Sequence, residues 1–75
     1  MKPYLFALNK QRRIAEPVNI YGNWFMLQVA FTFGVQLADG SMADYIGQCR
    51  SREAFLDLAL VNNWTVLDTH ELTSA

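Results

Sequence analysis

The stretch "WFMLQVAFTFGVQLADG", Trp24 to Gly40, decides which fold the sequence predicts. Its odd-numbered positions from 25 to 37 are all large and apolar, whereas its even-numbered positions from 28 to 38 are polar or small. Alternation with a period of two residues is typical of a β-strand with one buried face. The sequence therefore predicts a half-buried strand over 24–38. We expect a bend near Gly34, where a missing side chain permits one.

The same stretch has one alternative interpretation, a membrane span. No charged residue lies between Glu16 and Asp39, and a basic cluster precedes this gap, as in a span with a basic flank. However, Asn, Gln and Thr residues interrupt the apolar run. As a helix, 24–38 would rise only about 22 Å, short of the roughly 30 Å hydrocarbon core. We therefore expect no membrane span.

The "LADGSM" segment that follows is a hairpin signal. A three-residue loop that ends in a left-handed Gly40 would pair Val35 with Ala43 and Phe33 with Tyr45. This register keeps apolar residues on one face, which a two-residue turn would not do. The sequence therefore predicts a second strand that begins near residue 43 and pairs with the strand over 24–38.

The segment after this hairpin predicts a helix and a last strand. Ser51 is a good N-cap for "REAFLDLALVNN", and Asn62 and Asn63 are stop signals. A short strand is predicted over 64–68. Residues 4–8 favour a strand, although their apolar spacing also permits a helix, and 17–21 is a candidate edge strand that begins with a proline.

Together these elements predict the α+β class. We expect a small, mostly antiparallel sheet, made of a β-β-α-β core with one or two extra N-terminal strands, and one helix packed on one face. Residues 1–75 form a single domain, and 71–75 are expected to be a frayed tail. The order of elements, with "DGS" in the hairpin and "SREAFLDLA" opening the helix, resembles several small regulatory or inhibitory proteins, including phage-encoded ones that bind host machinery.

The composition predicts an exposed apolar surface. Of 75 residues, 52% are hydrophobic and only 17% are charged, against a usual charged share of about 25%. A domain this small buries only about 60–65% of its unfolded surface, so some large apolar side chains must face water or a partner. This favours a protein-binding module or a homo-oligomer.

Four residues are the candidates for such an interface. Leu56 and Leu60 are four positions apart and should form one exposed ridge on the helix. The core face of that helix should hold Ala54, Phe55, Leu58, Ala59 and Val61. Met42 and Ile46 should extend the surface from the outward face of the second hairpin strand. Alternatively, further sheet or the N-terminal segment covers these residues.

A nucleic-acid interface is the alternative function. Residues 1–23 carry a net charge of +3 and residues 24–75 a net charge of −4. Lys10, Arg12 and Arg13 lie near aromatic residues and could grip a phosphate backbone. A solubilising loop is the plainer interpretation of the same cluster. A helix-turn-helix over 37–60 is disfavoured, because Glu53 would occupy an apolar position and an acidic helix repels phosphate.

The sequence predicts no catalytic residue and no metal site. Cys49 is the only cysteine and His70 the only histidine, and nothing in their positions brings them together. We expect Cys49 to point inward as a small hydrophobe. No cofactor, small-molecule substrate or membrane is expected as a partner. The N-terminal apolar run is too brief for a secretory signal, so we expect a cytoplasmic protein.

Overall fold

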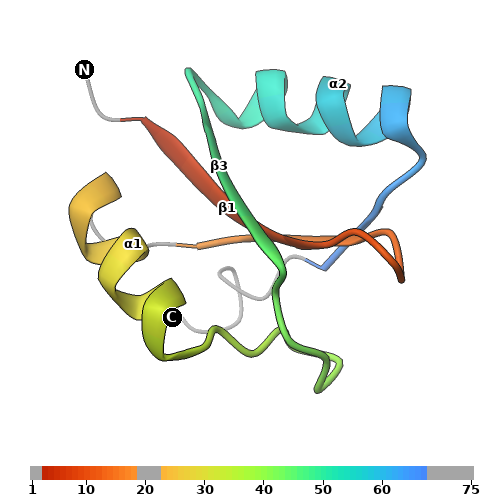
Figure 1. The fold of residues 1–75 in the computed structure, drawn as a ribbon. Coiled ribbons are helices and arrows are strands. Elements are labelled where there is room, and N and C mark those ends of the chain that lie inside the picture. The colour runs from red at the N-terminus through yellow and green to blue at the C-terminus, as the bar shows by residue number, and fades with distance from the viewer. Residues whose placement is uncertain (1–2, 19–22, 68–75) are drawn as a thin grey trace, which may run out of the picture.

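Four strands form one mixed sheet in the order β3-β1-β2-β4, and two helices accompany it (Figure 1). This computed structural model describes residues 3–18 and 23–67. Along the chain the elements are β1 (Tyr4–Asn9), β2 (Ile14–Pro17), α1 (Trp24–Phe33), β3 (Tyr45–Cys49), α2 (Arg52–Asn62) and β4 (Thr65–Val66). β1 pairs antiparallel with β2 and β3, whereas β2 and β4 are parallel. The predicted α+β class with a mostly antiparallel sheet is confirmed.

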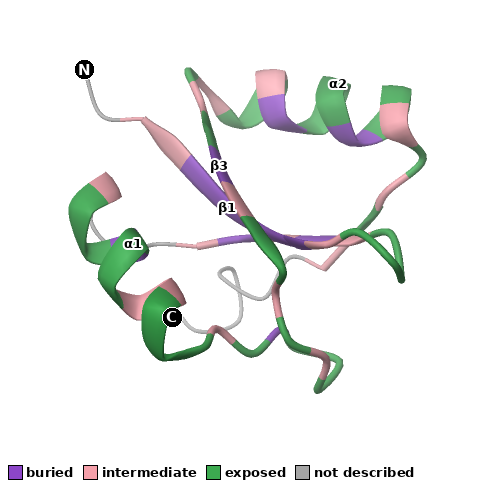
Figure 2. Ribbon diagram, viewed as in Figure 1, coloured by how far each residue is buried: buried purple, intermediate pink, exposed green. Residues whose placement is uncertain are grey.

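Both faces of the central strand β1 are covered. Leu5 and Ala7 point to one face and Phe6 and Leu8 to the other, because successive side chains of a strand alternate. All four are buried (Figure 2). The Phe6 ring lies 5.1 Å from the ring of Phe55, so α2 covers the Phe6 face. Figure 1 shows α1 on the opposite side of the sheet from α2.

The predicted strand over 24–38 is wrong, because 24–33 is the helix α1. Asn23 is its N-cap, and the Asn23 side chain accepts a hydrogen bond from the Met26 amide at 3.1 Å. Gly34 ends the helix with a φ of +106°, and the Gly34 amide donates to Phe31 O at 3.1 Å. The helix turns Leu27 into the core, flanked by half-buried residues, namely Trp24, Ala30 and Phe31. This inward stripe has helical spacing, but an apolar outward side hides it in the sequence.

The predicted hairpin loop is confirmed, although its flanking strands are not. The Ala43 amide donates to Val35 O at 2.8 Å, and Gly40 has a φ of +91°. The pairing of Phe33 with Tyr45 is wrong, since Phe33 is the last residue of α1. Tyr45 instead pairs with Leu8, because β3 adds to β1. The geometry of the turn thus fixes the register of the loop. It does not fix which strand β3 pairs with.

Helix α2 begins and ends where the sequence predicts. Ser51 Oγ accepts a hydrogen bond from the Ala54 amide at 3.1 Å, and Asn63 ends the helix in the left-handed conformation. The predicted core face is only partly right. Phe55 and Ala59 are buried, whereas Leu58 and Val61 are exposed.

The short strands at either end agree with the sequence in outline. Residues 4–8 are a strand and not a helix, and β4 lies inside the predicted 64–68. The second strand begins at Ile14, earlier than the predicted 17–21, most of which lies outside the described residues. The predicted tail 71–75 also lies outside them. None of the described helices is long and apolar enough to span a membrane.

Candidate functional site

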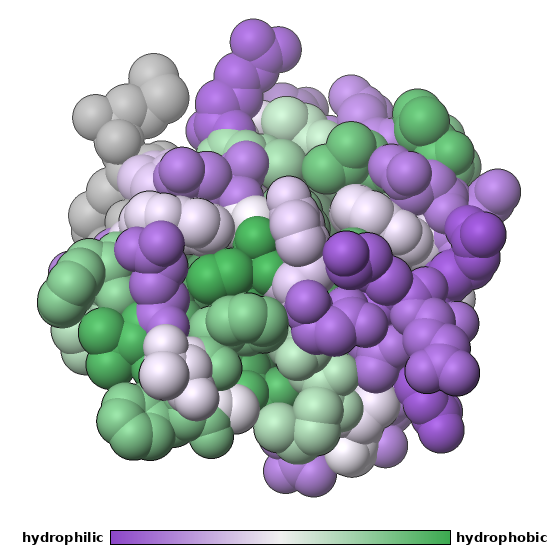
Figure 3. Space-filling model, viewed as in Figure 1, coloured by the Kyte–Doolittle hydropathy of each residue, from purple (hydrophilic) through white to green (hydrophobic). Residues whose placement is uncertain are grey.

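The outward side of α1 is an exposed apolar surface. We call it the outer face of α1; its residues are Phe25, Met26, Val29 and Phe33. Phe25 is 68% exposed and Phe33 is 86% exposed. In the view of Figure 3, hydrophobic side chains gather over α1, whereas hydrophilic side chains gather on the side of the β1–β2 turn. Single exposed apolar residues are ordinary, but a contiguous group on one helix marks an interaction surface.

The helix α1 carries no charged residue at all. Its only polar side chains are Gln28 and Thr32, and Thr32 Oγ1 donates to the backbone oxygen of Gln28 at 3.1 Å. These two residues are four positions apart and both are exposed, so they form one polar side of the helix, and the rest of its surface is apolar. A large apolar surface on a helix is normally buried. Here only the Leu27 side is fully covered. The outer face therefore lacks the cover that its composition calls for.

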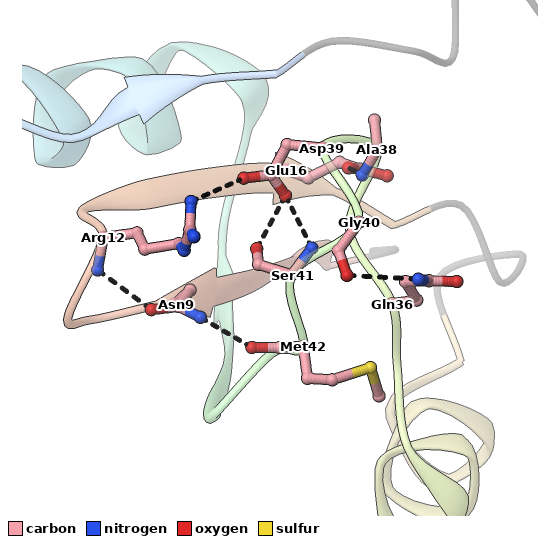
Figure 4. Close-up of polar contacts among 9 residues, drawn as sticks. All are labelled: Asn9, Arg12, Glu16, Gln36, Ala38, Asp39, Gly40, Ser41 and Met42. Carbon is pink, nitrogen blue, oxygen red and sulfur yellow. Dashed lines mark hydrogen bonds and ion pairs between the residues drawn. The ribbon is translucent and has the colours of Figure 1, made fainter.

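Met42 extends this surface at the C-terminal end of α1. A Cβ placed on Gly34 would lie 3.1 Å from Met42 Cε, so the methionine side chain reaches the end of the helix. Met42 is half exposed. Its backbone oxygen accepts a hydrogen bond from Asn9 Nδ2 at 2.9 Å, which ties this position to β1 (Figure 4). Met42 is thus held in place beside the outer face of α1.

The loop that carries Met42 is held by its own polar contacts (Figure 4). Asp39 Oδ1 accepts hydrogen bonds from both the Ser41 hydroxyl, at 2.6 Å, and the Ser41 amide, at 3.0 Å. These bonds lower the pKa of Asp39, with a smaller contribution from Arg12. The Ala38 amide donates to Glu16 Oε1 at 2.7 Å, which fastens the loop to β2. Hydrogen bonds therefore fix the conformation of this loop and its position against β2.

The structure separates the four interface residues that the sequence predicts. Leu56 and Leu60 are exposed on α2, as expected, at 38% and 78%. Ile46 pairs with Ala7, so it points to the side of the sheet away from α2, and it is only half exposed. Its expected position on a solvent face is wrong, because the unpredicted helix α1 lies on that side. Of the four, only Met42 adjoins the outer face of α1.

We call Leu56 and Leu60 the α2 ridge. The surroundings of this ridge are polar, unlike those of the outer face of α1. Leu56 borders an open hollow of about 480 Å³ whose other lining residues are Arg50, Ser51, Glu53, Ala54 and Asp57. Charges of both signs therefore stand beside this leucine. An apolar partner would have to desolvate them.

Replacing Leu56 and Leu60 together with glutamate should leave the fold intact. Both side chains are exposed, and surface substitutions usually change stability by less than about 0.5 kcal/mol per site. Urea unfolding followed by circular dichroism measures the change. A loss of more than about 2 kcal/mol would show that these leucines belong to the core.

The three basic residues of the β1–β2 turn, Lys10, Arg12 and Arg13, each contact a different part of the protein. Lys10 Nζ lies 5.2 Å from the centre of the Tyr45 ring, and Arg12 lies 3.9 Å from Asp39. Arg13 Nη1 donates to Asn62 O at 2.9 Å, where it caps the C-terminal end of α2. The three cations do not converge on one surface. The nucleic-acid alternative gains no support from this arrangement.

The predicted absence of catalytic chemistry concerns Cys49 and His70. Cys49 is half-buried against the core cluster of Phe6 and Phe55, and burial raises the pKa of its thiol. A protonated thiol is a poor nucleophile. His70 lies outside the described residues. Within 3–18 and 23–67, no group of three or more His, Cys, Asp or Glu residues could hold a metal ion.

One further hollow lies at the rim of the core, between β1, β3 and α2. It has a volume of about 280 Å³ and is lined by Phe6, Leu8, Lys10, Tyr45, Leu58, Asn62 and Trp64. Pockets for small ligands are usually about 300–1,000 Å³ and enclose most of the ligand. This hollow is smaller and open, so we assign no ligand to it.

The outer face of α1 is the surface that the sequence interpretation missed. Two signals could have found it: an N-cap residue at Asn23 and a helix-ending glycine at Gly34, which bracket a ten-residue segment. Comparison with protein-family models, with curated proteins and with solved structures finds no match for this chain. The functional assignment therefore depends on the geometry described above.

Proposed function

We propose that this protein is a non-catalytic protein-binding module that acts through the outer face of α1 together with Met42. One observation carries the proposal: a helix without any charge exposes two phenylalanines, a methionine and a valine to solvent. Aromatic residues and methionine are enriched at the centres of protein interfaces, where charged residues are depleted. Such a surface is expected to be covered when the protein acts.

A protein partner fits this surface better than a membrane does. Helices that lie on membranes combine an apolar face with a polar face rich in Lys and Arg. No Lys or Arg occurs between Arg13 and Arg50, and α1 has no charged face. Within the same proposal the protein is cytoplasmic, and its single thiol, Cys49, is compatible with a reducing compartment.

Replacing Phe25 with glutamate should abolish binding while the protein stays folded. The Phe25 ring is largely exposed, so the substitution should cost little stability, but a charge in an apolar contact must be desolvated. Leu56→Glu is the matched control, with the same added charge on α2. The measurement is site-specific cross-linking in the native host, with a photo-reactive phenylalanine analogue at position 33 or, as control, at position 60.

Covalent adducts with a protein should form from position 33, should be absent from position 60, and should disappear when Phe25→Glu is added. The mass of the adduct tells whether the partner is another protein or a second copy. If position 33 gives no protein adduct, or both positions give the same adducts, the proposed function is wrong.

A further inference from the structure

We infer that the partner of the outer face of α1 is a second copy of this chain, in a two-fold dimer whose axis passes beside Val29. The inference rests on the proposed function and names its partner. In this dimer the two α1 helices pack against each other, and each Phe25 lies beside the Phe33 of the other copy.

The first argument is symmetry. A two-fold interface uses the same patch on both copies, so the patch must be complementary to itself. The outer face contains the row Phe25, Val29, Phe33, at intervals of four residues. This row reads the same in both directions about Val29, which is its smallest member. A two-fold axis at Val29 lets the helices approach closely and places a phenylalanine at each end of the contact.

The geometry of the row also agrees with a common mode of helix packing. Residues four apart form ridges inclined to the helix axis, and two such ridges interdigitate when the helices cross at about 50°. The row from Phe25 to Phe33 is one such ridge and spans about 12 Å along the axis. We therefore expect the two α1 helices to cross at roughly this angle, with Val29 at the crossing point.

The second argument is charge. In a two-fold dimer every charge near the axis faces a copy of itself, so a charged patch repels itself. No charged residue lies between Glu16 and Asp39 in the sequence, and the whole of α1 falls within this interval. Two copies can therefore bring these faces together without opposing like charges. The α2 ridge, beside Glu53 and Asp57, does not offer this.

The third argument is area. Using roughly 200 Å² for a fully exposed large side chain, the outer face of α1 and Met42 expose roughly 550 Å² at their observed exposures. Two copies would bury at most roughly 1,100 Å², which is close to the approximately 1,000 Å² expected of a biological interface. This lies near the lower limit, so we expect a weak dimer with a micromolar dissociation constant.

The C-terminal residues are one competing occupant within the chain. Residues 68–75, "DTHELTSA", contain one large apolar side chain, Leu72, beside Asp68 and Glu71. One leucine cannot match the apolar area of two phenylalanines, a valine and two methionines. A second copy supplies an equal apolar surface. A chain that ends at Leu67 separates these occupants experimentally.

The test places like charges at the proposed two-fold axis, where they should repel each other. Light scattering on the purified wild-type chain should approach twice the 8.6 kDa mass of one chain as the concentration rises through the micromolar range. Val29→Glu and Val29→Lys should each dimerise at least about 100-fold more weakly, because like charges meet at the axis. An equimolar mixture of the two variants should associate again. Gln28→Glu and Gln28→Lys, on an exposed position outside the row, should dimerise as the wild type does.

A second measurement covers the case in which the charged variants do not fold. In a Cys49→Ala background, Val29→Cys should form a disulfide between copies on mild oxidation, because the two positions face each other. Gln28→Cys should not. A monomeric wild type, a mixture that fails to associate, or a disulfide from position 28 instead of 29 overturns the inference. So does a chain ending at Leu67 that dimerises when the full chain does not, since the tail would then be the occupant.

These outcomes remain distinct from failure of the proposed function. If the wild type is monomeric but position 33 still cross-links to another protein in the host, the module has a different partner and only the dimer is wrong. If position 33 yields no adduct of any kind, both proposals are wrong.

Discussion

Replacing Phe55 with alanine should be among the most destabilising single substitutions in this protein. Phe55 is fully buried, and its ring centre lies 5.1 Å from that of Phe6 and 5.7 Å from that of Tyr4. Truncating a buried phenylalanine typically costs about 3–5 kcal/mol, from lost transfer free energy and from the cavity left behind. A 75-residue domain has a total unfolding free energy of roughly 4–11 kcal/mol. The variant should therefore lose a large part of the unfolding free energy of the protein.

Urea unfolding followed by far-UV circular dichroism measures this loss. Leu60→Ala is the matched control, because Leu60 lies on the same helix but is exposed. It should change the unfolding free energy by less than about 0.5 kcal/mol. Equal losses from the two variants would contradict the position of the core between α2 and the sheet.

Replacing Gly47 with alanine should also destabilise the protein, by about 1–3 kcal/mol or more. A Cβ on Gly47 would overlap the Phe6 ring, at 2.8 Å from Cε1 and closer still to Cζ. Phe6 cannot move aside easily, because it is buried and its ring lies 5.1 Å from Phe55 and 5.8 Å from Trp64. On backbone grounds alone, alanine in an extended strand should stabilise the protein by about 0.4–1 kcal/mol. The packing effect is larger, so the net change is a loss.

A double-mutant cycle separates the overlap from other causes. Phe6→Leu shortens the side chain that lies over Gly47, so Gly47→Ala should cost much less in the Phe6→Leu background. Gly40→Ala is the control, because Gly40 has a positive φ and nothing within 4 Å of its added Cβ. Its cost is backbone strain, which Phe6→Leu should not relieve. If the costs of Gly47→Ala and Phe6→Leu are simply additive, the proposed overlap is wrong.

The local signals in the sequence were reliable. Ser51 was identified from residue type alone as the start of a helix, and Asn62 and Asn63 as its stop signals. Ser51 and Asn63 act as caps in the structure, and Asn62 is the last helical residue. The three-residue loop that ends in Gly40 was chosen because it keeps apolar residues on one face of two strands. Its register is the observed one, although most of the first of those strands is the helix α1. Each of these features depends on contacts within a few residues. The fold class was predicted correctly, although one of the strands from which it was inferred is the helix α1.

The error over 24–33 arose because two periods fit the same residues. Large apolar side chains at every odd position satisfy the strand pattern, but Trp24, Leu27 and Phe31 also satisfy the helical one. In an ordinary surface helix the outward side is polar and resolves the ambiguity. Here the outward side is apolar as well. The apolar outer face of α1, which is the proposed contact surface, therefore also made the sequence of this helix resemble that of a strand.

The sequence by itself determined the positions of α2 and of the hairpin loop, because caps and turns act through neighbouring residues. It favoured a strand over 4–8 but also permitted a helix there. Tertiary structure alone decided that β3 pairs with β1 and that α1 covers the second face of the sheet. It also decided that α1 lies on the Ile46 side of the sheet, whereas Phe25 and Phe33 remain exposed. Strand partners and helix faces are chosen by contacts between residues far apart in the chain. The free energy of those contacts depends on what each surface buries in three dimensions, and no local pattern of residues contains it.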